Sequence, residues 1–112
     1  MAIGDRIPTE LVAPTALSSA ASTLFTNGGA AYRTQGLCLS LANTGTASRT
    51  ITLYKNGNSA NSTWLNGVVV GAASSVVIPC NKVFTGTQIL AARQDTGTDV
   101  ILCFDGIVEQ IA

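Results

Sequence analysis

The side chains that could carry out chemistry in this chain are six carboxylates and three cysteines, and histidine is absent. Without histidine the chain lacks the commonest general base and the commonest metal ligand. Nucleophile triads that depend on histidine are therefore excluded.

Two pairs of carboxylates could form a site, one as an acid/base couple and one as calcium ligands. Asp105 and Glu109 stand four residues apart, or about 13 Å along a strand, and a glycosidase needs carboxyls about 5 to 9.5 Å apart. We interpret them as solvated edge charges that discourage sheets from stacking. Asp95 and Asp99 flank a tight turn. Two carboxylates supply too few ligands for calcium, which prefers roughly six to eight oxygens. The sequence predicts no catalytic residue, no cofactor and no metal site.

Cys38, Cys80 and Cys103 form no C-x-x-C motif, and each lies within an apolar run. They are expected to be small buried hydrophobic residues, with a Cys38–Cys103 bridge as a minor alternative. Free thiols favour assembly in a reducing cytosol.

Trp64 follows a long uncharged loop over residues 56–66. A tryptophan flanked by amides can stack on a sugar ring, but such a residue more often caps a core or anchors an interface.

The elements that must position these residues are strands. From residue 22 onward, turn signals such as Asn27-Gly28-Gly29 and Asn43-Thr44-Gly45 recur every eight to twelve residues or so, which is typical of a β-sandwich or barrel. Residues 37–42 alternate, which places Leu37, Leu39 and Leu41 on the core face. The sequence predicts an all-β fold: one antiparallel sandwich or barrel, jelly-roll or Ig-like, of about seven or eight strands.

Residues 1–20 differ from this pattern, since they hold Pro8 and Pro14 and show no clear period. We expect an extended N-terminal arm over 1–20, which docks on a neighbour or on the body, and a sandwich domain over 21–112. The N-terminus lacks the pattern of a secretory signal. The longest nearly apolar run, residues 68–79, has about half the length that spans a bilayer.

Charged residues make up only 11% of the chain, and the net charge is zero. A near-neutral, weakly charged surface promotes association. No basic patch is present to replace counterions on phosphates, which argues against nucleic-acid binding.

The order of "GLCLSLANTGTASRTITLYKNG" and the segments after it resembles small virion proteins of tailed phages. In those proteins a strand ending in "ANTG" precedes a "TVTLY"-like strand. A leucine-containing segment, an apolar strand after a small-residue turn, a "G-x-x-I-x-A" element and a final "V-x-G-x-E"-like strand follow. The corresponding parts here are residues 42–45, 49–54, 64–71, 74–79, 86–91 and 105–109. The resemblance covers about residues 23–110 and implies a β-sandwich virion component, often a head decoration (cement) protein or a small tail or neck protein.

Composition and resemblance together favour a non-enzymatic decoration protein on the capsid surface, assembled in the host cytoplasm. Its expected partners are the major capsid protein and copies of itself, for example as a trimer, with no nucleic acid, membrane or small-molecule substrate. A tail, neck or fibre-base component and a carbohydrate-binding module stay as alternatives. Partner contacts are predicted for the arm and for the polar loop with its flanks: Ile3, Ile7, Leu11, Val12, Tyr54, Asn58, Asn61 and Trp64.

Overall fold

Eight β-strands run through residues 2–112, the part of the chain that the computed structural model describes. A short 3-10 turn, η1 (Ala60–Ser62), precedes the fifth strand. In chain order the strands are β1 (Arg6–Ala16), β2 (Ser22–Thr26), β3 (Tyr32–Asn43), β4 (Arg49–Lys55), β5 (Thr63–Val70), β6 (Ser75–Thr85), β7 (Ile89–Gln94) and β8 (Val100–Gln110).

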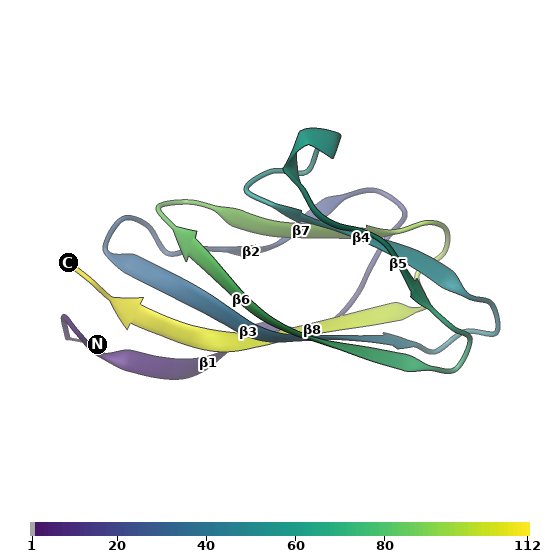
Figure 1. Ribbon diagram of the computed structural model, residues 1–112, viewed down its shortest axis with the longest axis horizontal. Helices are drawn as coiled ribbons and strands as arrows, with labels where there is room; N and C mark the ends of the chain where they lie inside the picture. Colours follow the sequence, from purple (N-terminus) through teal and green to yellow (C-terminus); the bar gives the residue numbers. More distant parts are fainter. Residues whose placement is uncertain (1) are drawn as a thin grey trace.

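The strands form two four-stranded sheets packed face to face (Figure 1). Sheet A has the order β1-β8-β3-β6 and sheet B the order β2-β7-β4-β5, with every pairing antiparallel. Consecutive strands lie in different sheets except β4 and β5, which pair within sheet B. This is the strand order of a jelly roll, an architecture that recurs in viral capsid and lectin domains. The predicted all-β sandwich is confirmed, and of its two named variants the jelly roll is the one observed.

The core lies between the sheets and follows the period-two pattern of the strands. Leu39 and Leu41 of β3 face Ile51 and Leu53 of β4, and all four are fully buried. Phe84 joins the two sheets, because its ring meets Phe25 and Phe104 edge to face at centroid distances of 5.5 and 6.2 Å. Edge-to-face aromatic pairs add stability beyond the area they bury.

Leu37 was predicted to face the core with Leu39 and Leu41, and this was wrong. The register of β3 shifts between Gly36 and Cys38 against both of its neighbours, and against β8 Leu37 is the extra residue of a β-bulge. A bulge interrupts the alternation of a strand. Leu37 is consequently 38% exposed.

In the N-terminal segment, residues 6–16 are extended and pair with β8 of the same chain as an edge strand of sheet A. Pro8 and Pro14 fit this place, since proline is tolerated on sheet edges. Val12 and Leu17 are buried in the core. Docking of this segment on a neighbouring subunit stays a prediction.

Buried amide side chains hold the turns at the ends of the sandwich. Nδ2 of Asn27 donates to the carbonyls of Gly29, Tyr32 and Gly86 at 2.8–3.2 Å. Asn43 likewise bonds the carbonyls of Ala47 and Val70. The Asn-rich turns therefore tie segments from different strands together. Within residues 2–112, no helix has the length and apolar character needed to cross a membrane.

Candidate functional site

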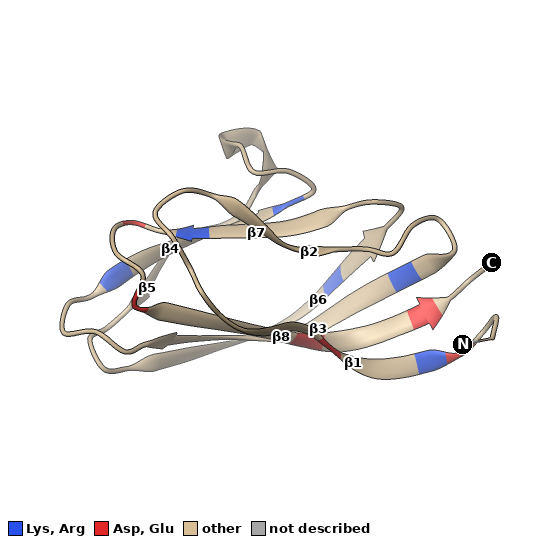
Figure 2. Cartoon of the chain, turned by 180° about the vertical axis from the view of Figure 1, so that it is seen from behind, with Lys and Arg blue, Asp and Glu red and all other residues tan. Residues whose placement is uncertain are grey.

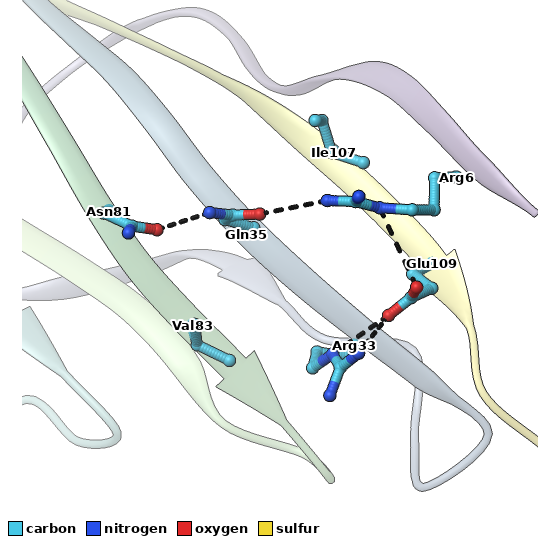
Figure 3. Close-up of a pocket in the computed structure, with 7 residues that line it drawn as sticks. All are labelled: Arg6, Arg33, Gln35, Asn81, Val83, Ile107 and Glu109. Carbon is cyan, nitrogen blue, oxygen red and sulfur yellow. Dashed lines mark hydrogen bonds and ion pairs between the residues drawn. The ribbon is translucent and has the colours of Figure 1, made fainter. Parts of the chain in front are cut away.

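A shallow polar hollow of about 380 Å³ lies on the outer face of sheet A and receives residues from all four strands (Figure 3). Side chains alternate between the faces of a strand, so the residues that line the hollow are those that point away from the core. They are Arg6, Arg33, Gln35, Asn81, Val83, Ile107 and Glu109.

Glu109 of β8 is the centre of the charged part of the hollow. Arg33, directly opposite on β3, donates to Oε1 of Glu109 through Nε at 3.0 Å and also through Nη2. Arg6, opposite on β1, places its Nε 3.7 Å from Oε2. Two guanidinium groups share one carboxylate, which leaves the hollow with a net positive charge.

Two amide side chains continue this row toward β6. Gln35 accepts a hydrogen bond from Nη2 of Arg6 at 3.4 Å and donates to Oδ1 of Asn81. Guanidinium and amide groups recognise carboxylates, phosphates and polar surfaces. Glu109 is engaged by two arginines and is not a free general base, so the hollow is suited to binding and not to proton transfer.

Asp105 and Glu109 share the outer face of β8, with Ile107 between them, as the sequence indicated. They differ in their surroundings, because Glu109 faces two arginines whereas Asp105 lies opposite Glu10 of β1. The interpretation as edge charges was wrong in one respect: β8 is an inner strand of sheet A.

The turn at residues 95–99 is held by an ion pair and an amide. Arg49 donates to both carboxylate oxygens of Asp99, at 2.9 and 3.1 Å, and Gln94 donates to Oδ1 at 2.9 Å. These hydrogen bonds, that of Arg49 first, lower the pKa of Asp99 from 3.8 to about 2. The carboxylate that could have served a cation is thus occupied by an arginine. Among residues 2–112, no three His, Cys, Asp or Glu side chains are grouped as a metal site.

The turn after β3, which carries the "ANTG" motif, docks on this same aspartate. Thr44 donates to the main-chain oxygen of Asp99 through its amide at 2.9 Å and through its hydroxyl at 3.0 Å. A Cβ at Gly45 would lie 2.1 Å from Oδ2 of Asp99, so the turn approaches this closely because position 45 is glycine. The motif has a structural role that joins two turns.

Trp64 lies at the edge of the sandwich where β5 of sheet B faces β6 of sheet A. It packs partly against the core, and Nζ of Lys82 lies 5.1 Å from the centre of its ring. This cation–π contact occupies a face of the ring. The arrangement supports the interpretation of Trp64 as a cap on the core.

The polar loop rises from the end of β4 and carries η1 above sheet B (Figure 1). Asn58 and Asn61 are exposed within it. Tyr54, a predicted partner contact, is buried and only 7% exposed. It lies opposite Thr63 and the fully buried Ala91 in register, and η1, which immediately precedes Thr63, contacts β4.

The remaining predicted contact residues divide between surface and core. Ile3 is 70% exposed and Ile7 is 45% exposed. Leu11 packs partly against the core, and Val12 is buried in it. Partner contact by any of these residues stays a prediction, and it would use Ile3 and Ile7 most directly.

The three cysteines are free and half-buried. Cys38 lies opposite Asp105, whereas Cys103 lies opposite Ser40, so the two thiols occupy diagonal positions of β3 and β8. Diagonal Cα atoms are about 7–8 Å apart, near or beyond the limit for a disulfide. Cys80 packs against the core, and burial raises the pKa of its thiol.

The hollow itself was not foreseen from the sequence. Arg33 and Gln35 alternate with buried residues of β3, which marks them as outward-facing. Nothing local in the sequence brings Arg6, Asn81 and Glu109 beside them, because their strands are far apart in the chain and meet only through the sheet order.

No model of a known protein family matches the chain, and no curated protein matches it in sequence. Solved structures with the same fold do match. A subunit of the disulfide-linked pili that form Bacillus endospore appendages has a TM-score of 0.58 at 14% identity, over 99% of this chain and 93% of that one.

Two viral structures are also similar. A chain from the acid-stable capsid of Helicobacter pylori bacteriophage KHP30 has a TM-score of 0.56 at 7% identity, over 96% of this chain and 95% of that one. A chain of the T13 particle of IBDV has a TM-score of 0.51 at 13% identity, over 96% of this chain but only 30% of its own length. At these identities the likeness establishes the jelly-roll fold.

Proposed function

We propose that this chain is a structural protein of a bacteriophage virion, and that it decorates and stabilises the capsid at the junctions between capsomers. The observation that carries the proposal is the jelly roll itself, which matches a chain of the KHP30 capsid over nearly the full length of both. The proposed location is the outer capsid surface, after assembly in the host cytoplasm.

The surface chemistry supports a role in assembly. The chain has zero net charge and only 11% charged residues, which favours association over mutual repulsion. Two of the carboxylates are engaged by arginines, Glu109 by Arg33 and Asp99 by Arg49. The chain also has no histidine to act as a general base, and the proposed role is structural and not catalytic.

The contacts with the major capsid protein are assigned to two exposed segments. One is the raised loop with Asn58 and Asn61, and the other is the N-terminal segment with Ile3 and Ile7. Each contact is weak alone, but many copies on a lattice, together with contacts between copies such as a trimer, raise the effective concentration. Long polar loops are common carriers of such contacts.

The test compares phage particles that carry this chain with particles that lack it. We expect a copy number comparable to that of the major capsid protein, by quantitative mass spectrometry, and loss of resistance to heat or low salt when the chain is missing. Asn58→Ala with Asn61→Ala should weaken binding to the particles, whereas Thr98→Ala, in an exposed turn elsewhere, should not. Particles that survive stress equally well without the chain would refute the stabilising role.

The copy number per particle and a glycan array separate the alternatives. A few copies per particle, set by the symmetry of the tail, would identify a tail, neck or fibre-base component instead. Binding on a glycan array that Trp64→Ala abolishes would identify a carbohydrate-binding module.

A subunit of an extracellular filament is the second candidate. Its support is the match to the endospore pilus subunit, which spans 99% of this chain, together with three free thiols. Filaments in electron micrographs that dissociate only under reducing conditions would favour this function over capsid decoration.

A further inference from the structure

We propose that the outer face of sheet A is a two-fold interface with a second copy of this chain, in which the acidic pair Glu10 and Asp105 of each copy enters the hollow at Arg6 and Arg33 of the other. Figure 2 shows charged positions of both signs on the strands of this sheet. The inference does not depend on the proposed virion function, since a soluble dimer would form whether or not the chain binds capsids.

The acidic pair is an electrostatic conflict within the single chain. Glu10 of β1 lies directly opposite Asp105 of β8, and both side chains are exposed on the outer face of sheet A. Like charges directly opposite each other destabilise an antiparallel pair. Within residues 2–112, neither carboxylate has an ion-pair partner. A cationic group from outside the chain would remove this cost.

The hollow carries an excess of positive charge. Arg6 and Arg33 share the single carboxylate of Glu109, and their side chains are 57% and 50% exposed. Guanidinium groups have donors left for a further carboxylate and bind it through paired hydrogen bonds. The concave shape of the site suits a side chain that enters from a facing surface.

The spacing of the two groups makes the face self-complementary. On β8, Glu109 marks the hollow and Asp105 marks the acidic pair, and Ile107 lies midway between them. A two-fold axis over Ile107, perpendicular to the strands and in the plane of the interface, places the hollow of each copy on the acidic pair of the other. Such an isologous contact uses one patch twice.

The centre of the patch is apolar. Pro8 lies opposite Ile107 across β1 and β8, and Val83 and the bulge residue Leu37 are 42% and 38% exposed nearby on β6 and β3. An apolar centre with charges around it is the usual anatomy of a protein interface. A small anion in the hollow would neutralise its positive charge but would leave the acidic pair without a cationic partner. A second copy of the chain supplies carboxylates to the hollow and arginines to the acidic pair.

The first experiment measures self-association of the full chain by sedimentation velocity over a concentration series. We expect a monomer–dimer equilibrium that weakens as salt is raised. Glu10→Gln with Asp105→Asn should weaken the dimer on the order of 100-fold. The same change removes the repulsion within the monomer, so its Tm should stay level or rise; a loss of association through unfolding would lower it.

The second experiment exchanges the charges. Arg6→Glu with Arg33→Glu makes the patch acidic, and Glu10→Arg with Asp105→Arg makes it basic. Each variant alone should be monomeric, and an equimolar mixture should form a heterodimer because both ends of the interface are again complementary. Arg93→Glu, on the outer face of sheet B, is the matched control and should dimerise like the unchanged chain.

Three results would each overturn the proposal. The first is a chain that stays monomeric up to millimolar concentration. The second is an oligomer of any size that both sets of charge variants leave intact. The third is a monomer whose Tm rises with inorganic phosphate and loses that rise in Arg6→Glu with Arg33→Glu, which would make the hollow a small-anion site.

Discussion

Asp99 connects three segments that lie apart in the sequence. Its carboxylate accepts hydrogen bonds from Arg49 of β4 and Gln94 of β7, and its main-chain oxygen accepts from Thr44 after β3. Gln94 is fully buried and also accepts a hydrogen bond from the amide of Val100 at 3.0 Å. These contacts close one end of the sandwich.

The low pKa of Asp99 predicts a specific pH dependence of stability. The hydrogen bonds from Arg49 and Gln94 depress this pKa in the folded state from 3.8 to about 2. A depressed carboxylate pKa stabilises the fold above the unfolded value, and the stabilisation is lost as the pH falls from there toward the folded value. We expect Asp99→Asn to lower Tm at neutral pH and the difference from the unchanged chain to shrink between about pH 4 and pH 2.

Circular dichroism melts across that pH range provide the measurement. Asp95→Asn, in the same turn, is the control, because within residues 2–112 the carboxylate of Asp95 accepts a hydrogen bond only from the adjacent amide of Thr96. A difference that is constant with pH would contradict the assignment.

Gly36 and Gly106 lie opposite each other in sheet A, where the core has no space for side chains. A Cβ on Gly36 would come within 2.0 Å of the ring of Phe104, and one on Gly106 within 2.2 Å of the main-chain oxygen of Gln35. The two glycines thus make room for Phe104 and for close packing of the strands.

We expect Gly36→Ala to lower the free energy of unfolding by about 1–3 kcal/mol, because the ring of Phe104 must move. Gly106→Ala should cost at least as much, since a backbone atom cannot move aside as a side chain can. Gly71→Ala is the control, as its nearest neighbour would be Ser74 at 3.5 Å. Urea denaturation measures all three, and equal costs for Gly36→Ala and Gly71→Ala would refute this explanation.

At the scale of elements, β1 decides whether the N-terminal segment belongs to the domain. It forms an edge of sheet A and is joined to β2 of sheet B by a connection whose Leu17 is 1% exposed. The main-chain amide of Leu17 also donates to the carbonyl of Val100 at 2.9 Å. The segment therefore contributes to the core as well as to the sheet.

Leu17→Ala should reduce the free energy of unfolding by about 2–5 kcal/mol, the range for a buried leucine that leaves a cavity. Ile3→Ala, at a position 70% exposed, should change it by no more than about 0.5 kcal/mol. The comparison uses urea denaturation of the full chain below the concentration at which it associates. A negligible effect of Leu17→Ala would mean that this segment docks loosely, as a detachable arm would.

At the scale of the whole molecule, the chain closes on itself. The first strand pairs with the last, and apart from β4 and β5 the paired strands are not consecutive in the sequence. Loop closure must precede these contacts, and folds dominated by distant pairings are slow to form.

We therefore expect refolding from urea to take about milliseconds to seconds, as in other all-β sandwiches. Stopped-flow fluorescence of Trp64 is a suitable probe, because this residue of β5 packs partly against the core and its ring contacts Lys82 of β6. Folding within microseconds would contradict the expectation.

Local patterns were enough to predict most of the strands. The alternation in residues 37–42 and the Asn- and Gly-containing turns on either side of it predicted a strand that lies within β3. The period of two and the conformational preferences of turn residues act over a few neighbours. Composition alone also limits the chemistry, because the chain has no histidine and few charged side chains wherever the fold places them.

Tertiary structure alone decided what depends on partners far along the chain. The bulge that exposes Leu37, the burial of Tyr54 and the incorporation of β1 into sheet A all follow from strand pairing. The same pairing sets Arg6 and Arg33 around Glu109, and Glu10 against Asp105. Which strands become neighbours is set by the packing of the whole core, and no window of local sequence contains that information.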